Sequence, residues 1–572
     1  MLNKNVCRTL FATASMGVLS ACGANDIASP GTGGGVNINV STPAPSPTPT
    51  PSPTPTPTPA AVTPAAGCPT IANPVGLTDG GTITNTANRN SWRVCVLPAV
   101  FTQSSLLPYI PGLLYQLPGR VDVGTDRGNT TTGTTNVVLT IEPGVVTYAN
   151  VGNAWLAVNR GNSIQAVGTV QRPIVFTSRD NVLGLTTDTS SGQWGGIVLL
   201  GRGQVTDCQA TSATPGTNAC ERDTEGSVTP ALFGGTNNTE SSGRLSYVQI
   251  RYSGFILSNN IELQSLTTEG IGSGTVLDHI QSFNSSDDGA EFFGGRVNFK
   301  YFVSVGAEDD NLDTDTGIKA NFQYVLVAQR SGSEARGTDT IIEADSNSVS
   351  GTTSSLNLPR QNTIVSNFTF LHRVNNSSGQ AAVFLRGGTD YTLINGVVIA
   401  PQSPSCFRIN EAQTADLTAS LGNNGTGNAV PGAATGNDEL GTPVFRSVLM
   451  QCGATPFIAT NGPTVQQVTD IFGAGANGNS ITYTPTLTNT FVNGATETAV
   501  TPFNPTNLHA ASGIPSLTGG LGGQTAFFDA VTYIGAVRDA NDRWYEGWTC
   551  NSSTLMLGTS NTGLCTAMPV YS

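Results

Sequence analysis

Two stretches of the chain, NFKYFVSV (298–305) and NFQYVLVA (321–328), repeat one pattern of residues at an offset of 23. The preceding LDHIQSF (277–283) aligns with FKYFVSV (299–305) at an offset of 22. Internal periods of this length are typical of solenoids. Each copy consists of a short apolar strand and a polar turn, without the periodicity of a helix. The repeat therefore predicts an all-β chain whose coils of about 22 residues, with three short strands each, stack as a parallel β-helix.

The same alternation of strand and turn continues through the predicted solenoid, residues 68–524. Residues 206–240 and 407–440 interrupt it and are expected to be looped insertions, the second with a short helix at Glu411–Leu421. Several Asn-Gly pairs keep a β-sandwich array open as the competing architecture, because such pairs favour hairpins. Further matching segments are VVLTIEPGVV (137–146), RPIVFTS (172–178), GGIVLLGRGQV (195–205), RLSYVQIRYSG (244–254), NTIVSNFTFLHR (362–373) and YTLINGVVIA (391–400).

Composition narrows the possible partners. The formal net charge is -13, with 25 Lys and Arg against 38 Asp and Glu. Binding to nucleic acid requires a basic face, so we expect no nucleic-acid partner. The acidic balance instead fits a soluble surface protein or one that binds cations.

The N-terminal sequence has the features of an export signal. Residues 1–21 have a short basic start and a mostly apolar run, as a signal peptide does. The end of this run, LSAC (19–22), resembles a bacterial lipobox. The resemblance implies lipidation of Cys22 and membrane lipid as a partner. Gly23 stands where an inner-membrane retention signal has Asp. We therefore expect a lipid anchor in the outer membrane, at the cell surface, with the periplasmic face as the alternative.

A stalk follows the anchor. Residues 22–67 are rich in Gly and then in Pro alternating with Thr or Ser. Proline fixes φ and removes backbone donors, so this part is expected to be a disordered, extended polyproline II segment.

Eight cysteines remain after the signal peptide and the lipidated residue. An even number in an exported chain favours disulfides, although eight cysteines allow 105 pairings. Pairing of neighbours along the chain is the working hypothesis: Cys68–Cys95, Cys208–Cys220, Cys406–Cys452 and Cys550–Cys565.

Carboxylates are concentrated in SSDDGAEFFGG (285–295) and AEDDNLDTDTG (307–317). Asp287 and Asp309, Asp288 and Asp310, and Glu291 and Asp313 are each separated by 22 residues, the length of one coil. Adjacent strands lie about 4.8 Å apart, so the coil period places acid over acid. Stacked carboxylates repel unless they are protonated or a cation lies between them.

Oxygen ligands on short side chains in turns favour Ca²⁺ over zinc or copper. The sequence therefore predicts a calcium site, structural in role. The alternative is that these Asp side chains only cap backbone amides of the turns. The candidate ligands are Asp287, Asp288, Glu291, Asp309, Asp310, Asp313 and Asp315.

The order of motifs resembles a family of bacterial right-handed parallel β-helix surface lipoproteins. It runs IEPGVV, AWLAVNRGNSIQAVGTVQRPIVFTS, QWGGIVLLGRGQV, SSGRLSYVQIRYSG, the two acidic segments and finally FFDAVTYIGAV…WYEGWT. The resemblance covers residues 137–345 and 525–550. It implies a right-handed β-helix and a surface location, and no defined activity.

The C-terminal residues 525–572 are expected to form a cap. Trp544, Tyr545 and Trp548 would cover the open end of the solenoid, or alternatively bind glycan.

Three functions remain open at this point. The first is binding: adhesion, or presentation of a long face to a glycan or an outer-membrane receptor. The second is a polysaccharide lyase or hydrolase with its site at the acidic turns. The third is a structural role in a surface layer. The basic residues available to a lyase near those turns are Arg296, Lys300, Lys319, Arg330 and Arg336.

Overall fold

The computed structural model describes residues 61–130, 136–258, 261–331, 340–346, 358–373, 381–402, 405–415, 442–505, 527–559 and 562–571. The predicted signal peptide, Cys22 and nearly all of the predicted stalk lie outside these residues. So does most of the predicted helix at Glu411–Leu421, of which α2 (Ala412–Ala415) is described. No helix within the described ranges is long and apolar enough to span a membrane.

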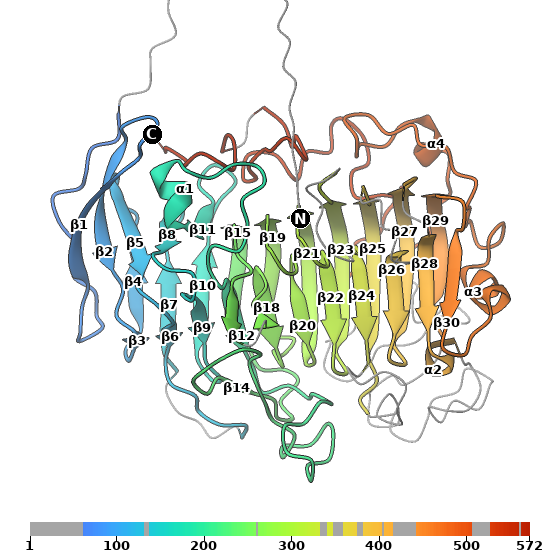
Figure 1. The fold of residues 1–572 in the computed structure, drawn as a ribbon, viewed down its shortest axis with the longest axis horizontal. Coiled ribbons are helices and arrows are strands. Elements are labelled where there is room, and N and C mark those ends of the chain that lie inside the picture. The colour runs from blue at the N-terminus through green and yellow to red at the C-terminus, as the bar shows by residue number, and fades with distance from the viewer. Residues whose placement is uncertain are drawn as a thin grey trace, which may run out of the picture. The chain divides into compact units, whose positions relative to one another are not determined.

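Two large sheets organise the described chain, and their strands are parallel except for the pair β1 and β2 (Figure 1). The 11-stranded short-strand sheet is ordered β3-β6-β9-β12-β18-β20-β22-β24-β26-β28-β30. Its strands are β3 (Val100–Phe101), β6 (Val121–Val123), β9 (Leu156–Val158), β12 (Ile197–Leu200), β18 (Leu266–Glu269), β20 (Glu291–Phe293), β22 (Leu312–Asp315), β24 (Ile342–Asp345), β26 (Ala381–Arg386), β28 (Ser405–Asn410) and β30 (Phe457–Thr460).

The 15-stranded sheet, called here the long-strand sheet, follows the order β1-β2-β5-β8-β11-β15-β19-β21-β23-β25-β27-β29, with β4, β7 and β10 beside this path. Its strands are β1 (Thr78–Thr84), β2 (Ser91–Val96), β4 (Ser105–Leu107), β5 (Leu113–Leu117), β7 (Val138–Ile141), β8 (Val146–Ala149), β10 (Ser163–Val167), β11 (Ile174–Ser178), β15 (Gly243–Arg251), β19 (Val276–Phe283), β21 (Arg296–Val305), β23 (Lys319–Ala328), β25 (Asn362–Leu371), β27 (Asp390–Ala400) and β29 (Val444–Cys452).

The observed register confirms the repeat that the sequence predicts. Leu277 of β19 pairs with Phe299 of β21, and Phe299 pairs with Phe322 of β23, all in parallel strands. The chain alternates between the two sheets, so that each coil stacks on the next. The predicted parallel β-helix is therefore correct, and the β-sandwich alternative is excluded.

A residue in the left-handed backbone conformation, with positive φ, interrupts the later strands of the long-strand sheet. Pairing skips Tyr247 opposite His279, and the same gap recurs in each later coil. Each coil therefore contains three strand segments, as predicted. The residues at this corner, all with φ between 50° and 66°, are Tyr247, His279, Tyr301, Tyr324, Asn367, Asn395 and Ser447.

The space between the sheets holds the main hydrophobic core. Phe292 of β20 lies 5.2 Å from Phe322 of β23, measured between ring centroids. Phe292 therefore fills the core between the sheets, whereas Phe293 lies outside that core. Neighbouring strand residues face opposite ways, so Phe293 points outward and packs against Phe233 of the first insertion.

The chain reverses after Phe293 through two glycines. Gly294 and Gly295 have φ of 61° and 74°. A Cβ on Gly295 would lie 2.2 Å from the carbonyl oxygen of Ile271, so this turn requires glycine.

The first insertion, near residues 206–240, lies on the outer face of the short-strand sheet. It contains the hairpin of β13 (Arg222–Asp223) and β14 (Leu232–Phe233). A second hairpin, β16 (Ile256–Ser258) with β17 (Ile261–Glu262), lies beside it, where Ser258 Oγ donates to the Gly226 carbonyl at 2.9 Å. The four predicted disulfides, Cys68–Cys95, Cys208–Cys220, Cys406–Cys452 and Cys550–Cys565, are all present.

The end of the stack is covered differently from the prediction. The helix α3 (Val465–Phe472) places Val468 and Phe472 against the last strands, β29 and β30, and so caps the core. The C-terminal segment instead lies along the flank of the long-strand sheet (Figure 1). The remaining helices, α1 (Arg179–Leu183) and α4 (Ala495–Thr498), are short.

The prediction that the C-terminal aromatic residues cover the open end of the solenoid is therefore wrong. Trp548 meets Tyr247 and His279 edge-on, and Trp544 packs on Tyr301. Tyr545 and Trp548 are buried, at 5% and 0% exposure, so they are not available to a glycan.

Substitution of Asn367 tests the corner. Its φ is 57°, and its side-chain amide donates to the carbonyls of Tyr533 and Gly535. Asn367→Val should lower the free energy of unfolding by roughly 2–4 kcal/mol, because a β-branched residue is strained in this conformation and buried carbonyls lose a donor. Urea denaturation measures the change. Asn367→Gly tolerates the conformation and should lose less; equal losses in both variants would contradict a role for the left-handed corner.

Candidate metal site on the acidic face

The carboxylates predicted from the sequence gather on the outer side of the short-strand sheet. In the parallel register Glu291 pairs with Asp313, and Phe293 with Asp315. Asp313 pairs in turn with Glu343 of β24. We call the resulting surface the acidic face; it comprises Glu269, Asp287, Asp288, Glu291, Asp309, Asp310, Asp313, Asp315, Glu343 and Asp345.

Strand alternation sorts the acids of the strands into two columns. Residues 292, 314 and 344 point inward, as shown by Phe292 and Ala344 in the core. Residues on either side of them therefore point outward. The first column is Glu291, Asp313 and Glu343, and the second is Glu269, Phe293, Asp315 and Asp345.

The turn preceding each strand adds a pair of aspartates. The backbone N–H of Asp310 donates to Asp288 Oδ1 at 2.8 Å, which places the two turns in adjacent coils. Asp310 Oδ1 accepts from the Thr340 N–H, also at 2.8 Å. The capping role that was the alternative for these turns therefore exists at Asp288 and Asp310. The second carboxylate oxygen of Asp288, Oδ2, remains available to bind a cation.

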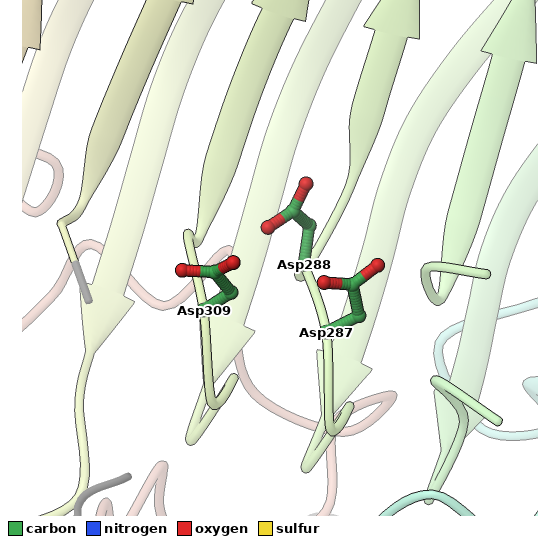
Figure 2. Close-up of side chains that lie close together, drawn as sticks. All are labelled: Asp287, Asp288 and Asp309. Atoms are coloured by element: carbon green, nitrogen blue, oxygen red, sulfur yellow. The ribbon is translucent and has the colours of Figure 1, made fainter. Parts of the chain in front are cut away.

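Two groups of three carboxylates have the geometry of a cation site. One is Asp287, Asp288 and Asp309 (Figure 2), and the other is Asp288, Glu291 and Asp313. Within each group the oxygens lie within 4.8 Å of one another. Five of the seven predicted ligands thus come together, and Asp288 belongs to both groups.

The other two predicted ligands have different surroundings. Asp310 caps Thr340 and contacts Glu343. Asp315 lies in the field of two guanidinium groups, those of Arg222 and Arg386. Asn311, beside Asp310 in the same turn, donates its side-chain amide to Ser304 at 2.9 Å.

Burial dominates the electrostatics of these acids. Burial, and then neighbouring carboxylates, raise the pKa of Asp288, Glu291 and Asp313 well above their ordinary values. Burial also raises the pKa of Asp309 and of Asp315 to about 7 each. Ionising all of these groups together is therefore costly unless positive charge is brought among them.

Two arginines supply the positive charge next to these acids. Arg386 Nε lies 2.5 Å from Asp345 Oδ2 and 2.7 Å from Glu343 Oε1. Arg222 pairs with Asp207 at 2.5 Å and with Glu225, both in the insertion region. None of the described Arg, Lys or His side chains forms an ion pair with Asp288, Glu291 or Asp313.

The basic residues singled out in the sequence lie elsewhere. Lys300 pairs with Asp529 on the long-strand sheet, and Arg330 pairs with Glu308 at 2.6 Å. Arg296 and Lys319 are buried at the start of β21 and β23, and Arg336 lies outside the described residues. The coil period does not identify Arg222, Arg386 or Glu343 as part of this site, because insertions separate them from the regular spacing of the other acids.

A family model for a pectate-lyase like beta helix domain matches residues 127–435, which include the whole acidic face. No curated protein and no solved structure matches the chain.

The acidic face predicts an unusual dependence of stability on pH. Its carboxyls have folded-state pKa values above the unfolded ones, so the native state binds more protons than the unfolded state between about pH 4 and about pH 7. In that window the free energy of unfolding must fall as pH rises. Metal-free protein should therefore melt at a lower temperature at about pH 8 than at about pH 5. Calorimetry in the presence of a chelator measures this; equal melting temperatures would contradict the raised pKa values.

Proposed function

The chain belongs to the pectate-lyase-like β-helix family, and from this premise we propose that its acidic face binds Ca²⁺ and, through it, an extracellular polysaccharide. The observation that carries the proposal is the group Asp288, Glu291 and Asp313, whose oxygens converge without a positive side chain between them. A divalent cation supplies the missing charge. Carboxylate oxygens from neighbouring coils suit the hard, flexible coordination of calcium.

The cation has a structural and a binding role in this proposal. It links the coils of β20 and β22, because Glu291 and Asp313 belong to successive strands. Calcium retains water among its ligands, and a carboxylate or hydroxyl of a sugar can replace that water. An acidic polysaccharide then meets positive charge on a surface that would otherwise repel it.

The N-terminal motifs complete the proposed setting. A lipid on Cys22 and the Pro/Thr-rich stalk would hold the β-helix at the outer membrane, where an extracellular polysaccharide is accessible. Binding at that location is adhesion, or delivery of a glycan to a neighbouring receptor in the membrane. A surface-layer component is the remaining possibility, and it would assemble without binding either ligand.

Removal of a single ligand tests the calcium proposal. Glu291→Gln should weaken calcium binding by roughly tenfold or more, because it deletes one of three charged ligands. Isothermal titration with calcium and elemental analysis of the purified protein give the affinity and the content. The control is Asp539→Asn, which alters an exposed acid paired with Arg538. Absence of bound calcium, or equal affinity in both variants, would refute the proposal.

A polysaccharide lyase is the second candidate, and two observations favour it: the family match and the position of Arg386. Its side chain is 34% exposed, and its Nε lies 2.7 Å from Oε1 of Glu343, at the end of the first column. A lyase needs a base to abstract a proton beside the uronate carboxylate. The acids around Arg386 raise its pKa. It would serve better to orient a sugar carboxylate than to remove a proton, so we rank binding first.

Incubation with acidic polysaccharides separates the two candidates. Binding without cleavage should appear as calcium-dependent retention of the protein on immobilised polysaccharide, lost in Glu291→Gln and kept in Asp539→Asn. The ultraviolet absorbance of an unsaturated uronate product should not rise. A rise that depends on Arg386 would identify a lyase instead, and lack of retention with any acidic polysaccharide would refute the binding proposal.

A further inference from the structure

The chain returns along the flank of the coils after the last strand. We call the described C-terminal residues, 527–559 and 562–571, the C-terminal strap. Asp529 contacts β23, Tyr533 contacts β25, and Cys550 contacts β19. Cys565 then reaches β15, and the hydroxyl of Tyr571 donates to Pro173, just before β11. The strap thus crosses successive coils from the later to the earlier ones.

Side-chain amides of the long-strand sheet hold the strap by its backbone. Gln323 accepts from the Asp529 N–H at 2.9 Å and donates to the Asp529 carbonyl at 3.2 Å. Gln281 makes the same pair of bonds with Cys550, at 2.8 and 3.0 Å. Gln249 donates to the carbonyl of Trp548. Gln323 and Gln281 thus each bind the N–H and the carbonyl of one strap residue, as the backbone of a neighbouring strand would. The strap is held in this way although it does not form a continuous strand.

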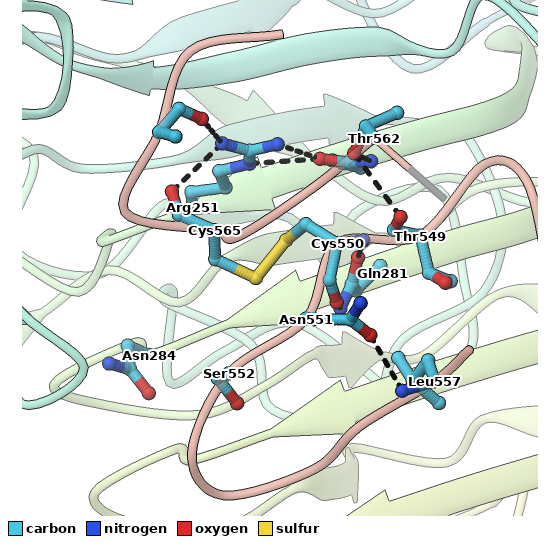
Figure 3. The surroundings of a disulfide bond; sticks show 12 residues. Arg251, Gln281, Asn284, Thr549, Cys550, Asn551, Ser552, Leu557, Thr562 and Cys565 are labelled. Carbon is cyan, nitrogen blue, oxygen red and sulfur yellow. Dashed lines mark hydrogen bonds between the residues drawn. A yellow bond between two sulfur atoms is a disulfide. The ribbon is translucent and has the colours of Figure 1, made fainter. Parts of the chain in front are cut away.

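Arg251 of β15 is the most tightly engaged of these side chains (Figure 3). It has 0% exposure, and its Nη1 donates to the carbonyls of Cys565 and Ala567 at 2.8 Å each. Its Nε donates to Gln249 Oε1, also at 2.8 Å. Burial lowers the pKa of Arg251 to about 10, which leaves it charged at neutral pH. Two of the oxygens that satisfy this buried charge belong to the strap.

The disulfide Cys550–Cys565 joins two of these contact points. One cysteine is bound to Gln281 and the other to Arg251, and both are buried, at 1% and 0% exposure. A covalent link between them limits the conformations of the strap once it is detached, and so favours the attached state.

The apolar surface under the strap is separate from the main core. Tyr252, Phe283, Val305 and Leu371 of the coils pack against strap residues that include Trp548, Leu555 and Leu557. This cluster faces outward from the long-strand sheet, whereas the main core lies between the two sheets. Loss of the strap would expose the outer cluster and leave the inner one packed.

We propose that the C-terminal strap is a latch, which opens as a unit from the flank while the coils remain wound, and that Arg251 and the Cys550–Cys565 bond hold it closed. Opening uncovers the apolar strip formed by Tyr252, Phe283, Val305 and Leu371. The acidic face lies on the other sheet and is not altered. The latch is therefore independent of the proposed calcium site.

Native-state hydrogen exchange followed by mass spectrometry of the full chain tests the proposal. In Cys550→Ser/Cys565→Ser and in Arg251→Met, amides of residues 548–557 should exchange faster by roughly tenfold or more. Amides of β20 and β22 should keep their wild-type rates. A dye that binds exposed apolar surface should bind more strongly to both variants.

Matched controls come from the same strand and from another disulfide. Arg244→Met removes an arginine of β15 that is 44% exposed and pairs with Asp278, and Cys208→Ser/Cys220→Ser opens the insertion. Neither should change exchange in the strap. Equal acceleration in β20 and β22 would show that the strap is part of one cooperative unit. Unchanged exchange at 548–557 would show that neither group holds it. Either result overturns the proposal.

The wild-type protein provides the test if a variant does not fold. In increasing, sub-denaturing urea the amides of residues 548–557 should lose protection before those of β20 and β22. Coincident loss of protection in the strap and the coils would overturn the latch.

Discussion

Parallel stacking of equivalent residues is the constraint on which the rest of this structure depends. Each coil places its strands about 4.8 Å from those of the next, with the side chains in register. Inside the coils this brings like apolar residues together, as Phe299 over Phe322. Outside, the same register brings Glu291 over Asp313 and Asp313 beside Glu343. A geometry that stabilises the core therefore concentrates charge on the surface.

The acids of the acidic face differ in whether a basic side chain relieves that repulsion. Arg386 lies within ion-pair distance of Asp345 in the second column and Glu343 in the first, and Arg222 acts on Asp315 from the insertion. Asp288, Glu291 and Asp313 form no ion pair with a described basic side chain and their pKa values are raised, so protonation or a cation from solution would relieve the repulsion there. A calcium ion would satisfy the oxygens of two coils and offer a contact to an anionic sugar. Stability and binding would then rest on the same few carboxylates.

The sequence predicts those features that follow from the coil period. The spacing of 22 residues is sufficient to place Glu291 over Asp313, and the hypothesis that neighbouring cysteines pair gives the four observed disulfides. Glu343 follows Asp313 by 30 residues, because an insertion interrupts the period, and so it was missed. Contacts between distant segments, such as that of Arg251 with Cys565, correspond to no periodic pattern in the sequence. The placement of Trp548 on the flank likewise depends on the whole fold, and composition alone suggested an end cap.

The most direct measurement is the location of the ion itself. A crystal structure of the protein grown with calcium, with anomalous diffraction collected to identify the metal, would place any bound ion on the acidic face. We expect a calcium peak coordinated by Asp288, Glu291 and Asp313, in contact with both coils. Well-ordered carboxyls paired through shared protons, with no ion among them, would contradict it.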